Sequence, residues 1–321
     1  MCQKLIHIVL LFIVGVLPLW AYDAFVGGLY YNLNNTTHEA ELADAGNHYS
    51  GPVNIPENIV WEGVAYRVTS IAPSAFYFRN GITEITIPST VRTIGRRAFS
   101  ICVGLTSVTI PNSVLSIGDE AFSSCSGLVS VTLPYNITAI GAYTFNACRS
   151  LQSITLPSEI KTIGASAFRG CCSLQAVTIP PKVTSIGGYA FSDCFSLVEV
   201  HLPASIIDID YFAFSNCYNL RDFYCLSPEL PQIEHTIFDG THLQDVRLHV
   251  QASSMSAYWA STPWIDFGCI LPVEDIAEGI APSMMKPKFP DVVIYDLTGR
   301  PLRVPPSRGV YIQNQTKQMV P

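Results

Sequence analysis

Three consecutive stretches share one pattern and decide the fold of this chain: SIGDEAFSSCSGLVSVTLPYNIT (residues 116–138), AIGAYTFNACRSLQSITLPSEIK (139–161) and TIGASAFRGCCSLQAVTIPPKVT (162–184). The stretches follow each other without a gap, and each is 23 residues long. Self-similarity at a fixed period of this length is typical of a solenoid, in which every repeat forms one coil of a stack.

The same pattern extends in both directions beyond these three stretches. A 23-residue step relates Phe76, Phe99, Phe122, Phe145, Phe168, Phe191 and Phe214, then Pro88, Pro111, Pro134, Pro157, Pro180 and Pro203, and then Cys102, Cys125, Cys148, Cys171, Cys194 and Cys217. The unbroken columns predict one curved solenoid over residues 71–224, with the phenylalanine rings stacked in its interior.

Each position of the repeat has a distinct structural role. Val108 and Ile110 alternate as in a strand, and Pro111 ends that strand because it has no N–H to donate to a neighbour. Gly118 belongs to a glycine column that indicates either a left-handed turn or a close contact between coils. The Ala-Phe pair that follows is expected to form a short helical turn.

The cysteine column is expected to remain unpaired. Adjacent coils lie about 4.8 Å apart, which would permit bridges by distance alone. Six equivalent side chains point the same way, however, so that pairing them would distort every second coil. A free cysteine is also a good small hydrophobic residue. We therefore expect a buried ladder of thiols and no metal site in this column.

The pattern resembles that of the BspA-like leucine-rich repeat family, whose repeat has the form IGxxAFxxCxxLxxVxIPxxVxx. Residues 22–70 are similar to the N-terminal cap of this family, and residues 225–272 to its closing segment, in which Trp259 and Trp264 are expected to cover the last coil. The resemblance implies a β-rich leucine-rich-repeat solenoid of 23-residue coils that stack a parallel β-sheet with short helical turns, capped at both ends.

The N-terminal 21 residues read as a secretory signal peptide. Lys4 precedes the apolar run LIHIVLLFIVGVLPLW, and Ala21 offers a cleavage point. The run is shorter than the about 20 residues of a spanning helix, and the mature chain has no other candidate. We therefore expect a protein that is secreted or displayed on the outer cell surface. The net charge of -7, without a basic cluster, argues against nucleic-acid binding.

Two columns of outward residues lie on the expected sheet: Glu84, Ser107, Ser130, Ser153, Ala176, Glu199 and Asp222, and beside them Thr86, Thr109, Thr132, Thr155, Thr178, His201 and Tyr224. The first five coils therefore present a hydroxyl-rich face. Threonine suits a half-exposed strand, which explains this face without a ligand. Alternatively, the face binds a partner, because the exposed sheet of a solenoid is a common binding surface.

The most chemically distinct spot is expected at the C-terminal end of this face. Glu199 and His201 share one side of a strand, with Asp222 and Tyr224 beside them on the next coil. The four residues are candidates for a binding hot spot, for a solvated last coil, or for a metal or acid–base site, which lacks a preorganised pocket here. The spacing of His235, His242 and His249 by seven residues indicates no site.

The C-terminal segment breaks the period. Residues 273–290 read as a linker. Residues 291–321 are similar to the C-terminal sorting module of surface proteins of Bacteroidetes-type bacteria, through Tyr295, Asp296, Gly299, Arg300, Gly309, Tyr311 and Ile312. The final TKQMVP lacks the usual basic-hydrophobic finish, so a simple terminal hairpin is the alternative.

The sequence thus predicts a non-enzymatic surface or secreted protein without a cofactor. The resemblance implies adhesion, through binding of an extracellular protein such as a host matrix or cell-surface protein, by a monomer. The alternatives are a carbohydrate- or peptide-capture module that uses the hydroxyl-rich face, a structural surface protein without a tight ligand, and a metal-dependent hydrolase.

Overall fold

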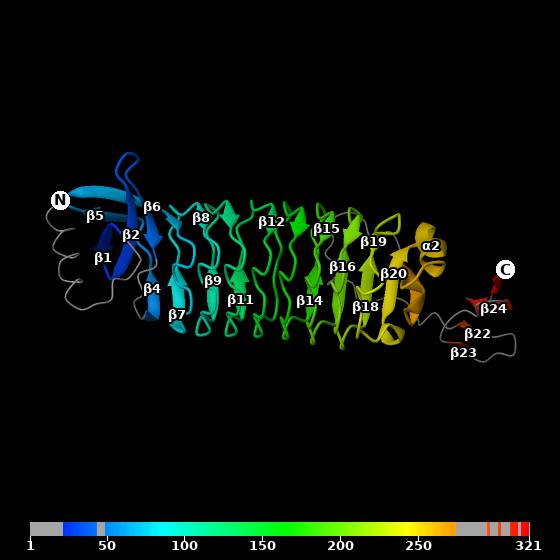
Figure 1. Ribbon diagram of the computed structural model, residues 1–321. Helices are drawn as coiled ribbons and strands as arrows, with labels where there is room; N and C mark the ends of the chain where they lie inside the picture. Colours follow the sequence, from blue (N-terminus) through cyan, green and yellow to red (C-terminus); the bar gives the residue numbers. More distant parts are fainter. Residues whose placement is uncertain are drawn as a thin grey trace.

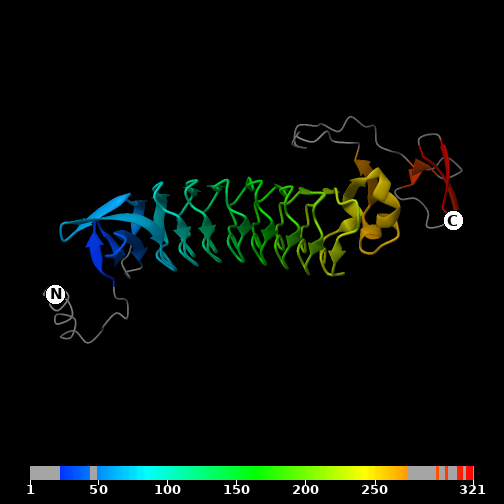
Figure 2. The same cartoon turned by 90° about the horizontal axis from the view of Figure 1, so that it is seen from above.

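The computed structural model describes residues 22–43 and 49–273, together with four short strands between residues 294 and 320. The coils stack along one axis into an elongated body, with the N-terminal strands at one end and helix α2 (Met255–Trp259) at the other (Figures 1 and 2). The expected solenoid of 23-residue coils with parallel strand pairing is confirmed.

All regular coils but the one that contains Ile154 contribute a longer strand to one side, and each regular coil contributes a two-residue strand to a second side. The longer strands form what we call the strand face: β4 (Ser50–Asn54), β7 (Gly81–Thr86), β9 (Ser107–Thr109), β11 (Ser130–Thr132), β14 (Ala176–Thr178), β16 (Glu199–Leu202), β18 (Asp222–Cys225), β20 (Arg247–Gln251) and β21 (Cys269–Val273). The two-residue strands are β8 (Thr93–Ile94), β10 (Ser116–Ile117), β12 (Ala139–Ile140), β13 (Thr162–Ile163), β15 (Ser185–Ile186), β17 (Asp208–Ile209) and β19 (Gln232–Ile233).

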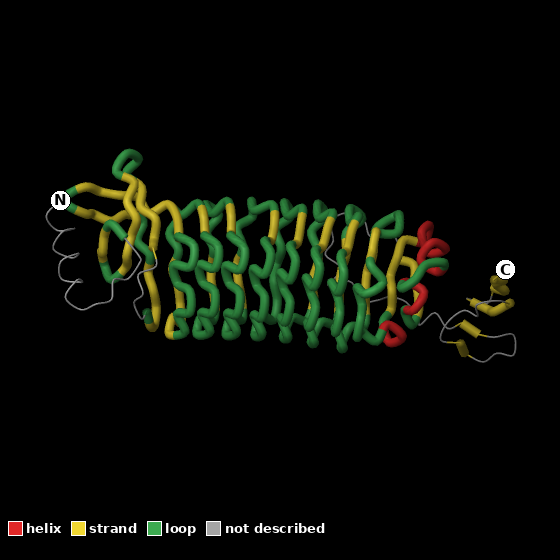
Figure 3. Tube along the Cα trace, viewed as in Figure 1, coloured by secondary structure: helices red, strands yellow, loops and turns green. Residues whose placement is uncertain are grey.

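The third side of each coil, which we call the turn face, consists of the segments that follow the glycine column, such as residues 95–102 and 187–194. These segments are turns rather than helices, and Figure 3 shows that loops and turns make up much of each coil. Residues 49–242, all of them described, contain no helix. Because no helix widens the turn face, the stack is nearly straight rather than curved as we expected.

The expected single sheet on the strand face is divided in two. One sheet has the order β11-β9-β7-β4 and the other the order β14-β16-β18-β20-β21. Ile154 lies in the coil between them, which forms no strand on this side. Two long backbone hydrogen bonds connect this coil to its neighbours at Gln152. The Gln152 N–H donates to the Val129 carbonyl at 3.3 Å, and the Gln152 carbonyl accepts from the Gln175 N–H at 3.3 Å. Ile154 is only half-buried, whereas its counterparts Val131 and Val177 are buried.

The phenylalanine column stacks in the interior, as expected. Neighbouring rings from Phe76 to Phe214 lie 5.1–5.6 Å apart, with their planes within 12° of parallel. All seven rings are at most 1% exposed. The rings therefore form a continuous apolar spine that joins one coil to the next.

The cysteine column packs beside this spine with free thiols. Each thiol donates to the carbonyl oxygen of the phenylalanine in the preceding coil, from Cys102 to Phe76 at 3.1 Å through Cys217 to Phe191 at 3.4 Å. In the next coil Thr241 takes the place of the cysteine, and its hydroxyl makes the same bond, to the carbonyl of Phe214 at 2.8 Å. A thiol or hydroxyl at this position thus bonds the preceding coil, and the thiols do so without a disulfide.

The glycine column reflects close contact between coils, and the left-handed backbone lies elsewhere. A Cβ on Gly118 would lie 2.5 Å from the backbone nitrogen of Arg96, and one on Gly164 would lie 2.7 Å from that of Ala142. The left-handed residues follow two positions later, as at Glu120 (φ 59°). The turn expected to be helical is thus a sequence of tight turns with alternating backbone conformation.

The N-terminal cap comprises β1 (Ala24–Val26), β2 (Leu29–Asn34), β3 (Glu39–Ala43), β5 (Asn58–Trp61) and β6 (Val64–Ile71). β1, β2 and β3 pair antiparallel in this order, and β5 pairs antiparallel with β6. β6 pairs parallel with β3 on one side and with β8, the first two-residue strand of the stack, on the other. The cap therefore joins the stack through a continuous sheet.

The segment expected to close the stack first extends it. β20 and β21 continue the parallel pairing of β18 beyond residue 224. The 3-10 turns η1 (Leu243–Asp245), η2 (Ala252–Ser254) and η3 (Trp264–Asp266) and helix α2 complete this end. Trp264 is 1% exposed, with its ring centre 5.9 Å from that of Phe238, and Trp259 is half-buried against the core.

Two predicted regions, the signal peptide and residues 274–290 of the linker, lie outside the described residues. In the C-terminal segment, β22 (Ile294–Tyr295), β23 (Pro301–Leu302), β24 (Gly309–Gln313) and β25 (Thr316–Val320) form an antiparallel sheet in the order β23-β22-β24-β25. Within the described part of the chain, no helix has the length and apolar character needed to span a membrane.

Candidate functional site

The outward residues of the strand face stand in the predicted register. Thr109 pairs with Thr132, and Thr178 pairs with His201. Thr109, Thr132, Thr155 and Thr178 are all exposed, so their hydroxyls form a flat polar ladder over the first coils. Beyond Thr178 the same column changes to rings.

The candidate residues at the end of the strand face do come together. Glu199 pairs with Asp222 and His201 with Tyr224, on the adjacent strands β16 and β18. β20 places Arg247 beside Asp222, and also places His249 beside Tyr224. We call these six residues the strand-face patch: Glu199, His201, Asp222, Tyr224, Arg247 and His249.

Three rings of the patch form a stacked column. The His201 and Tyr224 rings have centroids 4.1 Å apart and planes 12° from parallel. The Tyr224 and His249 rings repeat this geometry, at 4.1 Å and 10°. His201 is only 6% exposed, whereas Tyr224 and His249 are half-buried. Each ring therefore packs against the next, which restricts the rotation of its side chain.

A row of charged groups lies beside the rings. Asp222 accepts two hydrogen bonds from Arg247, at 2.8 and 2.6 Å, and lies 2.7 Å from Nε2 of His249. His201 contacts Glu199 through Nε2. Arg247 remains 52% exposed and Glu199 36% exposed, so both can still reach a partner.

Burial and neighbouring charges set the protonation of the patch. Burial lowers the pKa of His201 below its usual value, although Glu199 acts in the opposite direction. The contact between them is therefore a hydrogen bond from a neutral imidazole rather than an ion pair. Burial alone would raise the pKa of Asp222, but the hydrogen bonds from His249 and Arg247 outweigh it and lower the pKa. Burial and then the Asp222 and Glu199 charges raise the pKa of Tyr224 to about 12.

Sequence reasoning missed Arg247 and His249. Extra residues after β18 lengthen the step, so that His249 follows Tyr224 by 25 residues instead of 23. The spacing of His235, His242 and His249 by seven residues indicates no site, and of the three only His249 lies in the outward column of the strand face. The one signal in the sequence was the segment RLHVQ, which alternates as the other strands do.

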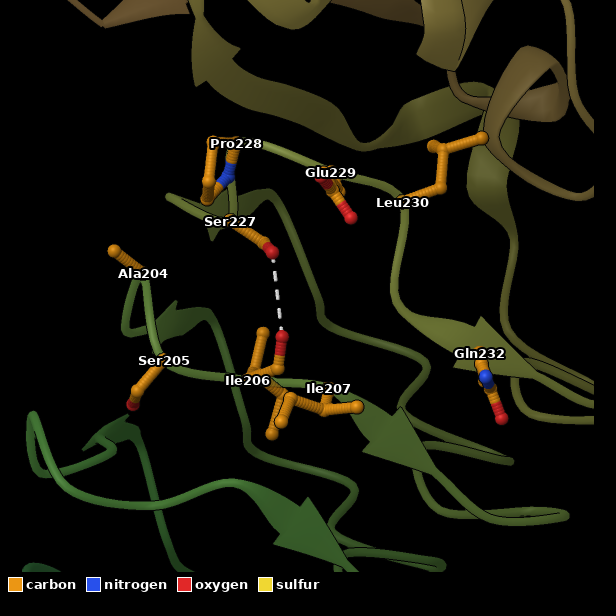
Figure 4. Close-up of a pocket in the computed structure, with 9 residues that line it drawn as sticks. All are labelled: Ala204, Ser205, Ile206, Ile207, Ser227, Pro228, Glu229, Leu230 and Gln232. Atoms are coloured by element: carbon orange, nitrogen blue, oxygen red, sulfur yellow. Dashed lines mark hydrogen bonds between the residues drawn. The ribbon is translucent and has the colours of Figure 1, made fainter.

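The insertion also opens a shallow gap between coils, away from the patch. Figure 4 shows the gap between the turn at Ser205–Ile206 and the inserted segment at Ser227–Glu229. Ser227 donates a 3.2 Å hydrogen bond to the Ile206 carbonyl across it. Glu229 is the one ionisable side chain among its lining residues, all of which are described, so this gap offers little chemistry for a ligand.

The arrangement of the patch does not match a metal site. Within the described part of the chain, no group of three or more His, Cys, Asp or Glu side chains is placed to hold one. Asp222 is already engaged by Arg247 and His249. The patch presents stacked rings beside the partly exposed carboxylate of Glu199 and the exposed guanidinium of Arg247. Tyrosine and arginine are residue types that are enriched in protein interfaces.

The fold and the patch define a leucine-rich-repeat solenoid with a differentiated strand face. The family model described as "BspA type Leucine rich repeat region (6 copies)" matches residues 63–171 and 138–261. The chain therefore belongs to the BspA-type leucine-rich repeat family.

Comparison with solved structures finds several leucine-rich repeat proteins that are similar to parts of the chain. A leucine rich cell surface protein from Faecalibacterium prausnitzii A2-165 is 20% identical, with a TM-score of 0.47 over 80% of this chain and 96% of that one. The leucine rich repeat protein of T. pallidum is 26% identical, with a TM-score of 0.43 over 63% and 81%. A leucine-rich repeat protein from Bacteroides ovatus is 20% identical, with a TM-score of 0.41 over 78% and 77%. No curated protein matches the chain significantly.

Proposed function

We propose that this chain is a secreted or surface-displayed adhesion protein that binds an extracellular protein partner on the strand-face patch. The observation that carries the proposal is the column of stacked rings at His201, Tyr224 and His249, flanked by charged groups. The apolar N-terminal run, read as a signal peptide, supports an extracellular location.

The patch has the properties of an interface centre. Its rings are held in place by stacking, so that little side-chain entropy is lost on binding. Tyrosine and arginine are the residue types enriched at binding hot spots, and both are accessible here. The threonine ladder, by contrast, is flat and uncharged, and its composition is explained by the needs of half-exposed strands.

A binding screen with matched variants tests the proposal. Full-length protein is passed over immobilised fibronectin, laminin, fibrinogen and collagen. We expect at least one of them to bind, and Tyr224→Ala and Arg247→Ala each to weaken that binding by about tenfold or more, a loss typical of hot spots. Thr132→Ala, in the ladder, is the control and should bind as the parent does.

Two results would count against the proposal. Binding that survives both patch substitutions would move the interface to another face. Absence of binding to all four proteins would favour a structural surface protein without a tight ligand.

A further inference from the structure

On the turn face, too, the sequence departs from the repeat toward the C-terminal end of the stack, in the coils that carry the strand-face patch. Where Gly187 begins the turn of one coil, Asp210 begins that of the next, and Tyr211 and Phe212 follow it. Tyr189 contributes a further ring from the preceding coil. We propose that these rings and the polar groups beside them form a second binding site, for a neutral carbohydrate.

The fold does not require rings at these positions. Tyr189 and Phe212 have left-handed backbone, with φ of 59° and 55°. In the other coils of this column, Tyr143 is the one further ring, whereas Ser74, Arg97, Glu120 and Ser166 have the same conformation, at φ of 55–60°, with side chains that are not aromatic. Since polar residues satisfy the backbone equally well, folding does not account for the aromatic side chains.

Tyr211 lies flat on the surface as a platform. A Cβ added to Gly188 would lie 2.9–3.1 Å from three atoms of the Tyr211 ring, so the ring rests face-on against a backbone that only glycine leaves open. Tyr211 is 43% exposed, and its ring is perpendicular to those of Tyr189 and Phe212, at 88° and 89°. The two latter rings stack on each other at 5.0 Å. The three rings thus form a rigid aromatic corner.

A shallow depression lined by polar groups adjoins this corner. Tyr189 and Phe212 line it on one side, and Asp193 and Asn216 line it as well. Asn216 donates a 2.8 Å hydrogen bond to Asp193, which fixes the carboxylate and the amide in place. The buried residues Ser192 and Ser215 also belong to the lining and are joined by a 2.9 Å hydrogen bond. Planar polar groups are therefore held beside the rings before any ligand arrives.

The chemistry of the depression selects a neutral ligand. Arg169 already lies 5.0 Å from the centre of the Tyr189 ring and bonds Asp193 at 3.3 Å, so the position that a ligand cation would take is occupied. Asp193 and Asp239, both in the lining, oppose an anion. A wholly apolar ligand would leave these polar groups desolvated. A pyranose sugar fits, because its C–H face packs on a ring while its hydroxyls bond fixed carboxylate and amide groups.

Calorimetric titration of the full chain tests the site. The probes are five neutral hexasaccharides: cellohexaose, xylohexaose, mannohexaose, maltohexaose and chitohexaose. We expect at least one to bind with a Kd of about 1 mM or tighter. Tyr211→Ala should weaken that binding by about tenfold or more, because it removes the platform.

Tyr143→Ala is the matched control. Tyr143 occupies the same column as Tyr189 with φ 56° and is 43% exposed, but it lies outside the aromatic corner and the depression. The control should bind the sugar as the parent does. If Tyr211→Ala does not fold, as judged by circular dichroism, Asn216→Ala takes its place, and the same loss is expected because it removes the fixed amide from the lining.

Three outcomes would overturn the proposal. The first is that none of the five sugars binds with a Kd below about 10 mM. The second is that the folded variant binds as tightly as the parent. The third is that Tyr143→Ala loses as much binding as Tyr211→Ala. If Tyr211→Ala instead abolishes binding of a matrix protein and no sugar binds, the corner is a protein interface.

Discussion

The two halves of the strand face, Thr109 to Thr178 and His201 to His249, are built from the same repeat and differ in their outward side chains. From Thr109 to Thr178 the outward column exposes hydroxyl groups, one coil apart. From His201 to His249 the same column consists of stacked rings beside charged groups. Behind both halves the inward residues remain buried and apolar, as at Val108 and Val200. The core therefore fixes the stack, and the outward positions vary without disturbing it.

The largest loss of stability is expected from a substitution in the phenylalanine column, which runs behind both halves of the strand face. Phe145 stacks 5.6 Å from Phe122 and 5.5 Å from Phe168, and it is fully buried. Phe145→Ala should lower the free energy of unfolding by about 3–5 kcal/mol, because the cavity cannot close between rigid coils. Urea unfolding followed by circular dichroism measures it, with Thr155→Ala as the exposed control. An unchanged midpoint would mean that the ring is not part of the interior.

A smaller effect is expected from the charged row of the patch. Asp222→Ala removes the acceptor of Arg247 and His249. The expected loss in unfolding free energy is about 1–2 kcal/mol, since these are charge-assisted bonds, weakened by the exposure of Arg247. Ser130→Ala, in the same outward column, is the control. Equal values for the two variants would show that the halves do not differ energetically.

The patch should also make stability depend on pH where the threonine ladder cannot. Burial lowers the pKa of His201, so the unfolded chain binds a proton more readily than the folded one. Stability is therefore complete above the ordinary histidine pKa of about 6.5 and falls as the pH drops below it. Thermal unfolding between about pH 7.5 and about pH 5.5 should have a shallower slope in His201→Gln than in the parent. Identical slopes would contradict a buried, neutral His201.

The smallest effect, none, is expected from reductant. The cysteine ladder runs behind both halves with free thiols, and burial raises the pKa of Cys102, Cys148 and Cys217 to about 12. Dithiothreitol should leave the melting temperature unchanged. Thiol titration of denatured, unreduced protein should find most of the nine cysteines outside the predicted signal peptide free. A count of one or none would show that the column is bridged.

Periodicity made the interior predictable. A column of identical residues at a fixed step leaves only one arrangement, so the phenylalanine stack followed directly from Phe76 and its successors. For the glycine column the sequence left two explanations open, because both a left-handed turn and close packing select glycine. The structure shows that close packing selects the glycines and that the left-handed residues are Glu120 and its equivalents.

What escaped prediction lies where the period fails or carries no information. His249 was missed because residues inserted after β18 shift its column. The interruption at Ile154 has no counterpart in the repeat pattern, which continues through that coil unchanged. The corner at Tyr211 depends on which way a ring tilts on a turn, and alternation along strands does not report this.

The regular 23-residue step also fixes the length of the molecule by the number of its coils. Each whole coil added or removed between the N-terminal cap and β16 would move the patch along the axis by about 4.8 Å while leaving the core columns in register. The distance between the N-terminal cap and the patch can therefore be altered in discrete steps.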